Sequence, residues 1–272
     1  MLNEREPILL CATGKKGVGK TYITNKLIKK YVRSNPKTGK KGRKVLIYDI
    51  NMEYSNAYKV IGVKDLKKFS RQNKIEVRRV LPINEDGSVA TLVEMVDILN
   101  TIIMTFRGGL LILEDINRYM IQARTTEVVG LLATNRHRDL DIVCHFQSLA
   151  PLDPRMWQNT AMVRFHYQMD DIKRYKNRIP NFELFNVAQC LVQNKYLKQG
   201  DKRFFCYVSN DDNYITGNFT SIDFQNAVTE YLERNPKILS DVAKRYGTGQ
   251  DARQKGITHI QKELKMKYYK GV

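Results

Sequence analysis

The clearest chemical signature lies near the start of the chain, where residues 14–21 read Gly-Lys-Lys-Gly-Val-Gly-Lys-Thr. This run fits the phosphate-binding pattern G-x-x-x-x-G-K-S/T at every fixed position. The glycines let backbone N–H groups turn toward a phosphate, and a helix beginning near Lys20 adds the positive end of its dipole. We expect Lys20 to reach the β- and γ-phosphates and the Thr21 hydroxyl to bind Mg²⁺. The predicted nucleotide contacts are Gly14, Lys15, Lys16, Gly17, Val18, Gly19, Lys20, Thr21 and Tyr22.

The segments around this loop give it the required setting. The apolar run 7–12 predicts a buried strand, and Ile23, Leu27 and Tyr31 share one face of a predicted helix. This strand–loop–helix order separates the match from a chance glycine-rich turn. ATP and GTP both suit such a loop, but the sequence has no Asn-Lys-x-Asp guanine motif. We therefore expect ATP as the cofactor, together with Mg²⁺.

A second group of polar residues could hydrolyse the nucleotide. A predicted buried strand, 110–113, ends in Glu114 and Asp115, a pair that could bind Mg²⁺ with Thr21 and activate a water. The usual order is Asp then Glu, so the division of duties within this pair stays open. The predicted strand 141–147 ends in Gln147, whose amide could reach the γ-phosphate and orient that water.

Two arginines stand just before that strand, at Arg136 and Arg138. In ring-shaped motors an arginine from one subunit reaches the nucleotide of its neighbour and stabilises transition-state charge. Arg136 is the first candidate for this role and Arg138 the second. The alternative is a surface turn that happens to carry two basic residues. His145 and His166 alternate with apolar residues, which indicates core positions and not metal ligands.

The composition is that of an ordinary globular protein, with 42% hydrophobic and 27% charged residues in 272. No apolar window is long enough to span a bilayer, and the acidic N-terminus does not resemble a signal peptide. We expect no membrane association and a cytoplasmic location, in the host cell if the protein is viral. The cysteines lack C-x-x-C spacing, so neither zinc nor disulfides are expected.

The charge of +18, from 46 basic and 28 acidic residues, favours a polyanionic partner such as nucleic acid. The range 29–44 holds eight basic residues and no acidic one. The alternative is a solvated basic surface without a partner. If the charge does bind nucleic acid, Lys40, Lys41, Arg43 and Lys44 should contact phosphates.

The predicted elements alternate along the chain, which indicates an α/β fold with a doubly wound, mainly parallel sheet. We expect one domain over 1–234, with a core of about 7–170, and a small basic, mainly helical appendage over 235–272. The appendage could hold a DNA-binding helix-turn-helix, or simply a packed basic helix. Further strands are predicted at 44–49, 75–80 and 161–167, helices at 89–106, 125–134, 183–194 and 221–234, and a hairpin at 203–216.

Taken together, residues 8–167 resemble the additional-strand P-loop ATPases of the HerA/FtsK superfamily, which includes viral genome-packaging ATPases. The resemblance rests on the loop, on Asp49-Ile50-Asn51-Met52-Glu53-Tyr54 after the second strand, on Glu114-Asp115, on Arg136-His137-Arg138-Asp139-Leu140-Asp141-Ile142 leading to Gln147, and on Pro151-Leu152-Asp153. It implies that Glu53 lies near the nucleotide, that Gln147 senses the γ-phosphate, and that Arg136 or Arg138 acts in trans. The reversed Glu114-Asp115 order departs from the family pattern.

The same resemblance implies a homo-oligomeric ring, a pentamer or hexamer, that drives double-stranded DNA through a central pore. We therefore predict an ATP-hydrolysing DNA translocase, the packaging motor of a virus or phage, with a capsid portal as a further candidate partner. The alternatives are a partition-type ATPase of the ParA/MinD kind, another DNA-pumping or assembly ATPase of the same superfamily, and a nucleotide-gated scaffold with negligible turnover. Lys15 occupies the signature-lysine position of the partition type, but Lys16 follows it where those proteins carry Gly.

Overall fold

A computed structural model describes residues 6–54, 57–116, 125–152 and 154–271. Asp153, part of the segment that resembles the HerA/FtsK superfamily, lies outside them. The chain forms two compact units, which are described separately. The first comprises Met1–Ala12, Gly19–Gln147 and Arg155–Ala161, and the second comprises Thr13–Val18, Ser148–Pro154 and Met162–Val272.

The first unit contains a sheet with the strand order β3-β4-β2-β5-β6-β1. The ladders from β3 through β6 are parallel, and Lys44, Gly109 and Leu140 are paired at the start of their strands. Every residue of β5 and β6 is buried, as expected for strands covered on both faces. The strands are β1 (Leu9–Thr13), β2 (Lys44–Tyr48), β3 (Lys59–Val60), β4 (Val77–Val80), β5 (Gly109–Leu113) and β6 (Leu140–Phe146).

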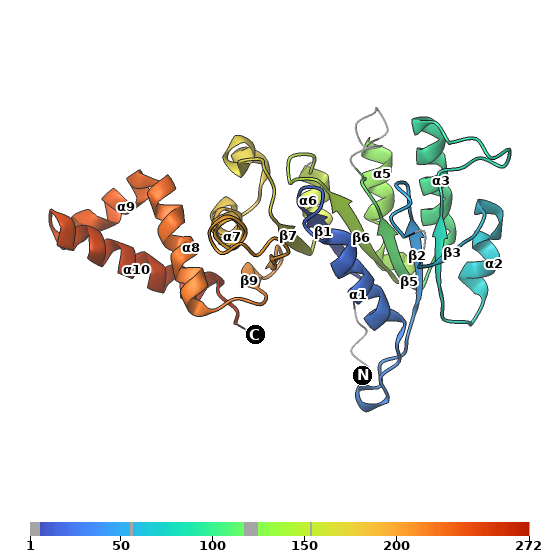
Figure 1. The fold of residues 1–272 in the computed structure, drawn as a ribbon, viewed down its shortest axis with the longest axis horizontal. Coiled ribbons are helices and arrows are strands. Elements are labelled where there is room, and N and C mark those ends of the chain that lie inside the picture. Colours follow the sequence, from blue (N-terminus) through green and yellow to red (C-terminus); the bar gives the residue numbers. More distant parts are fainter. Residues whose placement is uncertain (1–5, 55–56, 117–124, 153, 272) are drawn as a thin grey trace. The chain divides into compact units, whose positions relative to one another are not determined.

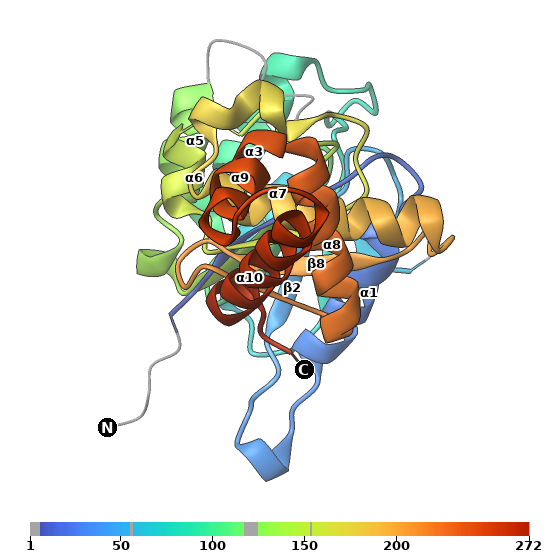
Figure 2. The ribbon, with the colours of Figure 1, turned by 90° about the vertical axis from the view of Figure 1, so that its left-hand side faces the viewer.

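Helices cover both faces of this sheet (Figures 1 and 2). Helix α1 lies on one face and helices α3 and α5 on the other, because the chain reverses its direction across the sheet and crossovers between parallel strands are right-handed. A capping box between Thr91 and Glu94 begins α3. The helices are α1 (Lys20–Val32), α2 (Leu66–Arg71), α3 (Leu92–Thr105), α5 (Thr125–Leu132) and α6 (Pro154–Asn159), with 3-10 turns η1 (Pro36–Thr38), η2 (Val63–Asp65) and η3 (Arg136–Arg138).

The second unit has an antiparallel group of strands, β7 (Met162–His166), β8 (Phe205–Ser209) and β9 (Tyr214–Thr216). A capping box between Thr220 and Asp223 begins its helix α8. The remaining elements are α7 (Phe182–Gln193), α8 (Ser221–Arg234), α9 (Pro236–Ala243) and α10 (Gln250–Tyr268), two 3-10 turns, η4 (Ile172–Arg178) and η6 (Lys244–Tyr246), and a π-helical turn, η5 (Asn194–Lys198).

The end of the chain is helical, as predicted, and its two helices pack within the second unit (Figure 1). Gly256 of α10 lies against the backbone of Ala243, so closely that an added Cβ would come within 3.2 Å of it. The Gln261 amide donates to the Gln225 carbonyl at 3.2 Å and to the Thr229 hydroxyl at 2.9 Å of α8. Helix α8 ends at Arg234 and α9 begins at Pro236, but the domain boundary at 234/235 and DNA binding by the tail stay predictions.

The predicted fold class is confirmed: an α/β protein with a doubly wound, mainly parallel sheet and a helical C-terminal part. The sequence patterns did not predict several short elements, among them β3, α2, α6, the 3-10 turns η2 and η4, and the π-helical turn η5. None of the helices in the described ranges combines the length and the apolar character needed to cross a membrane.

Candidate functional site

The phosphate-loop sequence connects β1 to α1, and its glycines have the backbone angles that such a loop needs. Gly14, Gly17 and Gly19 have φ values of 146°, 85° and 89°, a region in which other residues are strained. Gly19 is the N-cap of α1, and no acidic side chain occupies the first helical turn. The N–H groups that begin this helix are therefore available to an anion.

Thr21, the predicted Mg²⁺ ligand in the first turn of α1, donates its hydroxyl hydrogen to the carboxylate of Glu53. Glu53 is exposed and follows β2 in a turn organised by Asp49. The buried Asp49 carboxylate accepts the backbone N–H groups of Glu53 at 2.9 Å and Tyr54 at 3.1 Å. It also pairs with Arg79 at 3.0 Å. Asp49 thus positions Glu53 beside the Thr21 hydroxyl.

Glu114, at the end of β5, is buried and held by two donors. His145 Nδ1 lies 2.9 Å from one carboxylate oxygen, and the Tyr54 hydroxyl donates to the other at 2.5 Å. His145 Nε2 in turn lies 2.8 Å from the Thr24 hydroxyl of α1. Burial by itself would raise the pKa of Glu114, but His145, Tyr54 and the charge of Lys20 outweigh it and lower that pKa. Glu114 is therefore the anion of a buried network.

Asp115 follows Glu114 directly but contacts a different set of side chains. Its φ of 43° lies in the left-handed region, which is uncommon for a residue other than glycine and characteristic of functional turns. Its two carboxylate oxygens lie 3.4 Å from the Asn51 amide and 3.5 Å from the Gln147 amide. Gln147 is exposed directly after β6. The first unit thus brings together the acidic pair and the amide predicted to act beside it.

The two candidate arginines lie in η3, at the amino end of β6. Arg136 has 65% of its side chain exposed and, among the described residues, makes a single ion pair, with Glu6 at 3.8 Å. Arg138 is bound within its own chain, because it donates to the Thr134 hydroxyl at 3.1 Å and to the Met104 carbonyl at 2.9 Å. Since Gln147 follows the other end of the seven-residue strand, about 20 Å away, Arg136 is too far to act on the site of its own chain.

The part of the loop in the second unit is held by a pair of tyrosines. The Lys15 backbone N–H donates to the Tyr167 carbonyl at 2.9 Å. The rings of Tyr167 and Tyr196 are stacked with centroids 3.9 Å apart, and the Lys15 ammonium lies about 5 Å from both. A hydrogen bond with Tyr196 raises the pKa of Lys15. Gly14 is confined as well, since an added Cβ would lie 2.6 Å from the Cβ of His166.

The remaining predicted nucleotide contacts differ in exposure. Lys16 and Gly17 are exposed, Val18 is buried, and Tyr22 is exposed with the Lys26 ammonium 4.5 Å from its ring centroid. From the sequence, Thr24 has no predicted site role, His145 is expected in the core, and Asn51 enters only as part of the segment that resembles the superfamily. The polar character of His145 within a buried, mostly apolar strand was the available signal, but its partner Glu114 lies 31 residues away.

Within the described ranges, no group of three or more His, Cys, Asp or Glu side chains could hold a metal ion. A protein cage is not what Mg²⁺ requires, since this ion keeps waters and combines one or two protein ligands with substrate phosphates. The Thr21 hydroxyl and the carboxylates of Glu53, Glu114 and Asp115 are hard oxygen donors of the type that Mg²⁺ prefers. The residues present therefore fit a magnesium–nucleotide complex.

The fold is shared with viral proteins of known structure. The genome-packaging NTPase B204 of Sulfolobus turreted icosahedral virus 2, in complex with ATPγS, aligns with 77% of this chain and 95% of its own, at 17% identity and a TM-score of 0.51. The DNA-packaging ATPase B204 of Sulfolobus turreted icosahedral virus aligns with 78% of this chain and 97% of its own, also at 17% identity and a TM-score of 0.51. No protein-family model and no curated protein sequence matches the chain.

These similarities confirm, at the level of the fold, the predicted resemblance to viral packaging ATPases. The strand order agrees with it, because β6 lies between β1, which leads to the phosphate loop, and β5, which ends in the acidic pair. This interposed strand is the additional strand implied by the resemblance. The roles of the individual site residues stay predictions.

Proposed function

We propose that the protein is an ATP-hydrolysing DNA translocase, the packaging motor of a virus or phage, which acts as a homo-oligomeric ring. The observation that carries the proposal is the carboxyl edge of the first unit's sheet. There Gln147, at the end of the additional strand, lies beside Asp115, while Thr21 and Glu53 meet at the start of α1. This arrangement provides for phosphate binding, metal binding and water orientation together.

ATP would be held through its phosphates by the loop N–H groups and by Lys20, with Thr21 as the protein ligand of Mg²⁺. When bound there, Mg²⁺ would supply positive charge that offsets the negative charge developing on the phosphates. In this proposal Lys20 carries positive charge to the γ-phosphate and Thr21 orients the complex. The Lys20 charge also favours the ionised form of the nearby Glu114.

In this mechanism Glu114 and Asp115 have different roles. Asp115 has the Asn51 and Gln147 amides as neighbours. In this proposal its carboxylate would accept the proton of the attacking water. Glu114 is engaged by His145 and Tyr54, so it would act as a fixed negative charge near the bound complex. Glu53 accepts a hydrogen bond from the Thr21 hydroxyl and would help to hold Mg²⁺ or a water there.

Arg136 is proposed to act on the nucleotide of a neighbouring subunit. It is the exposed member of the arginine pair and lies at the opposite edge of the sheet from its own site. A ring, as a pentamer or hexamer, would supply the neighbour. Double-stranded DNA is the proposed substrate because the chain carries a net charge of +18. A capsid portal is the proposed docking partner.

The test is steady-state ATP hydrolysis by the purified chain, with and without double-stranded DNA, at low and moderate salt. DNA should increase the rate, and the increase should shrink as salt rises because phosphate contacts are salt-sensitive. A Lys20→Ala protein serves as the blank for contaminating ATPases. A hydrolysis rate above that of the blank that does not change with DNA at any salt concentration would contradict the assignment as a DNA translocase. Hydrolysis equal to the blank would contradict the enzyme assignment itself.

A further inference from the structure

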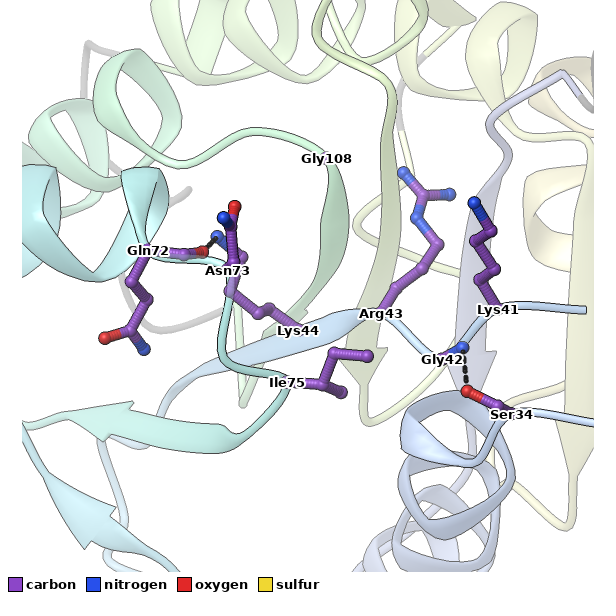
Figure 3. A pocket seen from close by; sticks show the side chains of 9 residues that line it. All are labelled: Ser34, Lys41, Gly42, Arg43, Lys44, Gln72, Asn73, Ile75 and Gly108. Carbon is purple, nitrogen blue, oxygen red and sulfur yellow. Dashed lines mark hydrogen bonds between the residues drawn. The ribbon is translucent and has the colours of Figure 1, made fainter.

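A pocket in the first unit lies away from the residues of the proposed ATP site. Its volume is about 430 Å³, and it is lined by Ser34, Lys41, Gly42, Arg43, Lys44, Gln72, Asn73, Ile75 and Gly108 (Figure 3). Lys44 begins β2 and Gly108 immediately precedes β5, so the pocket lies at the amino ends of the parallel strands. Asp49 and Glu114 lie at the carboxyl ends, about 15 Å along each five-residue strand.

Lys44 lines one side of this pocket and holds the segment after helix α2 in place there. Its ammonium group donates to the backbone carbonyls of Phe69 at 3.2 Å, of Gln72 at 2.7 Å and of Ser70. These carbonyls end helix α2, where a cation is favourable. Burial lowers the pKa of Lys44. The contact ties the segment with Asn73 to the start of β2, as Figure 3 shows. Lys44 is thus committed to the fold, contrary to the expectation that it contacts a polyanion.

The opposite wall belongs to the loop between α1 and β2, residues 33–43, which we call the basic arm. The Asn35 N–H donates to the Lys40 carbonyl at 2.8 Å, and the Gly42 N–H donates to the Ser34 hydroxyl at 3.0 Å. Gly42 closes the base tightly, since an added Cβ would lie 2.0 Å from the Val32 carbonyl oxygen. These contacts order the arm without a ligand. The Ser34 hydroxyl accepts here, so its own hydrogen can be donated elsewhere.

The charges of the pocket select an anion. Its nine lining residues, all within the described ranges, include three basic side chains and no acidic one. Arg43 is already paired, because its guanidinium lies 2.6 Å from the Asp139 carboxylate and 3.8 Å from that of Asp141. Lys41 is exposed and has no hydrogen-bond or ion-pair partner among the described residues. Figure 3 shows Lys41 and Arg43 extending side by side from the arm. Asn73 adds an exposed amide donor.

We infer that this pocket binds a phosphate of the DNA backbone, with Lys41 as its main cationic contact and Ser34 and Asn73 as neutral donors. The inference rests on the proposed function and adds the place where DNA is held. A polyanion fits better than a single small anion, because the arm continues the positive charge with the exposed Arg33, Lys37 and Lys40. The pocket and the proposed ATP site are joined by the rigid strands β2 and β5.

The test compares Lys41→Ala and Asn73→Asp with wild type for binding to a fluorescein-labelled DNA duplex over a range of salt concentrations. Lys41→Ala should weaken binding several-fold and reduce the slope of log K against log salt by about 1. Asn73→Asp should weaken it at least as much, since it places a negative charge at the phosphate. Lys64→Ala is the matched control: it removes one exposed lysine of η2, beyond the other end of α2, and should leave affinity and slope unchanged.

Unchanged affinity and slope in both pocket variants, with wild type binding DNA, would overturn the inference and leave the proposed function standing. Loss of DNA-free ATP hydrolysis in Lys41→Ala would also overturn it, because Lys41 would then serve a nucleotide. Lys41-dependent binding of polyglutamate, with DNA binding unaffected, would assign the pocket to an acidic protein. If the wild-type protein does not bind the duplex, that result would contradict the proposed function, and the inference that rests on it would fall as well.

Discussion

At the carboxyl edge of the first unit's sheet, Asp49 and Glu114 are buried and bonded on both oxygens, whereas at the amino edge Lys41 is exposed without a partner in the described ranges. Buried, bonded charges hold a fixed geometry and are little affected by salt. Exposed cations are not fixed in position by partners, but they attract polyanions from solution. In the proposed function, the buried carboxylates would hold the geometry of the ATP site, and the exposed lysine would contribute affinity for DNA.

The largest expected effect concerns the carboxyl edge. Lys20→Ala should reduce ATP turnover to background, because it removes the positive charge from the β- and γ-phosphates. Its folding should be unaffected, as judged by circular dichroism and the melting temperature. Lys64→Ala, which removes a lysine far from the phosphate loop, should keep wild-type turnover. Near-normal hydrolysis by Lys20→Ala would show that this edge does not perform the chemistry.

The next prediction joins the two edges across subunits. Arg136→Ala should reduce turnover by about 10³-fold while nucleotide binding persists, because an arginine finger acts on the transition state. Mixing Arg136→Ala with Lys20→Ala subunits should restore part of the activity, since some interfaces then combine an intact arginine with an intact loop. Rates in the mixture no higher than those of the separate variants would exclude action in trans.

Arg138 is the matched comparison for this experiment. Its guanidinium is bound to Thr134 and Met104 of its own chain. Arg138→Ala should therefore lower the melting temperature more than Arg136→Ala does, and mixing it with Lys20→Ala should restore less activity. The reverse order in both measurements would exchange the roles of the two arginines.

A smaller effect should appear in the pH dependence of stability. Because the folded pKa of Glu114 is lowered, its ionised form stabilises the fold at neutral pH, and this is lost as pH falls below the unfolded value of about 4.3 toward the folded pKa. Glu114→Gln should cost about 2 kcal/mol of unfolding free energy at neutral pH and less in acid. Urea unfolding of wild type and Glu114→Gln at neutral and at acidic pH measures this loss. A loss of equal size at the two pH values would contradict the ionised network.

The smallest effect separates two lysines at the amino edge. Lys44→Met should lower the unfolding free energy by about 1–2 kcal/mol, because it leaves the carbonyls that end α2 without their donor. Lys41→Met, at an exposed position, should change it by less than about 0.5 kcal/mol. Urea unfolding of the two variants provides the measurement. Equal losses would mean that Lys41 is as much part of the fold as Lys44.

Much of this protein could be predicted from local sequence alone. The phosphate loop is a contiguous motif whose glycines determine its backbone, and the strands and longer helices follow from hydrophobic periodicity. The predicted helix over 221–234 agrees with α8 at both ends, where a capping box and a following proline mark the limits. The short elements β3 and α2 were missed, because two to six residues carry too little periodicity.

The tertiary structure decided the partners of each charge. Glu114 meets Tyr54 across 60 residues and Arg43 meets the Asp139 carbonyl across 96, so no spacing in the sequence predicts either contact. Lys41 and Lys44 look alike in the basic run, yet Lys41 is exposed, whereas the Lys44 ammonium binds the backbone carbonyls at the end of α2. Sequence patterns report local backbone preference and burial. The pairing of side chains depends instead on which strand ends the sheet brings together, and that is settled only when the chain folds.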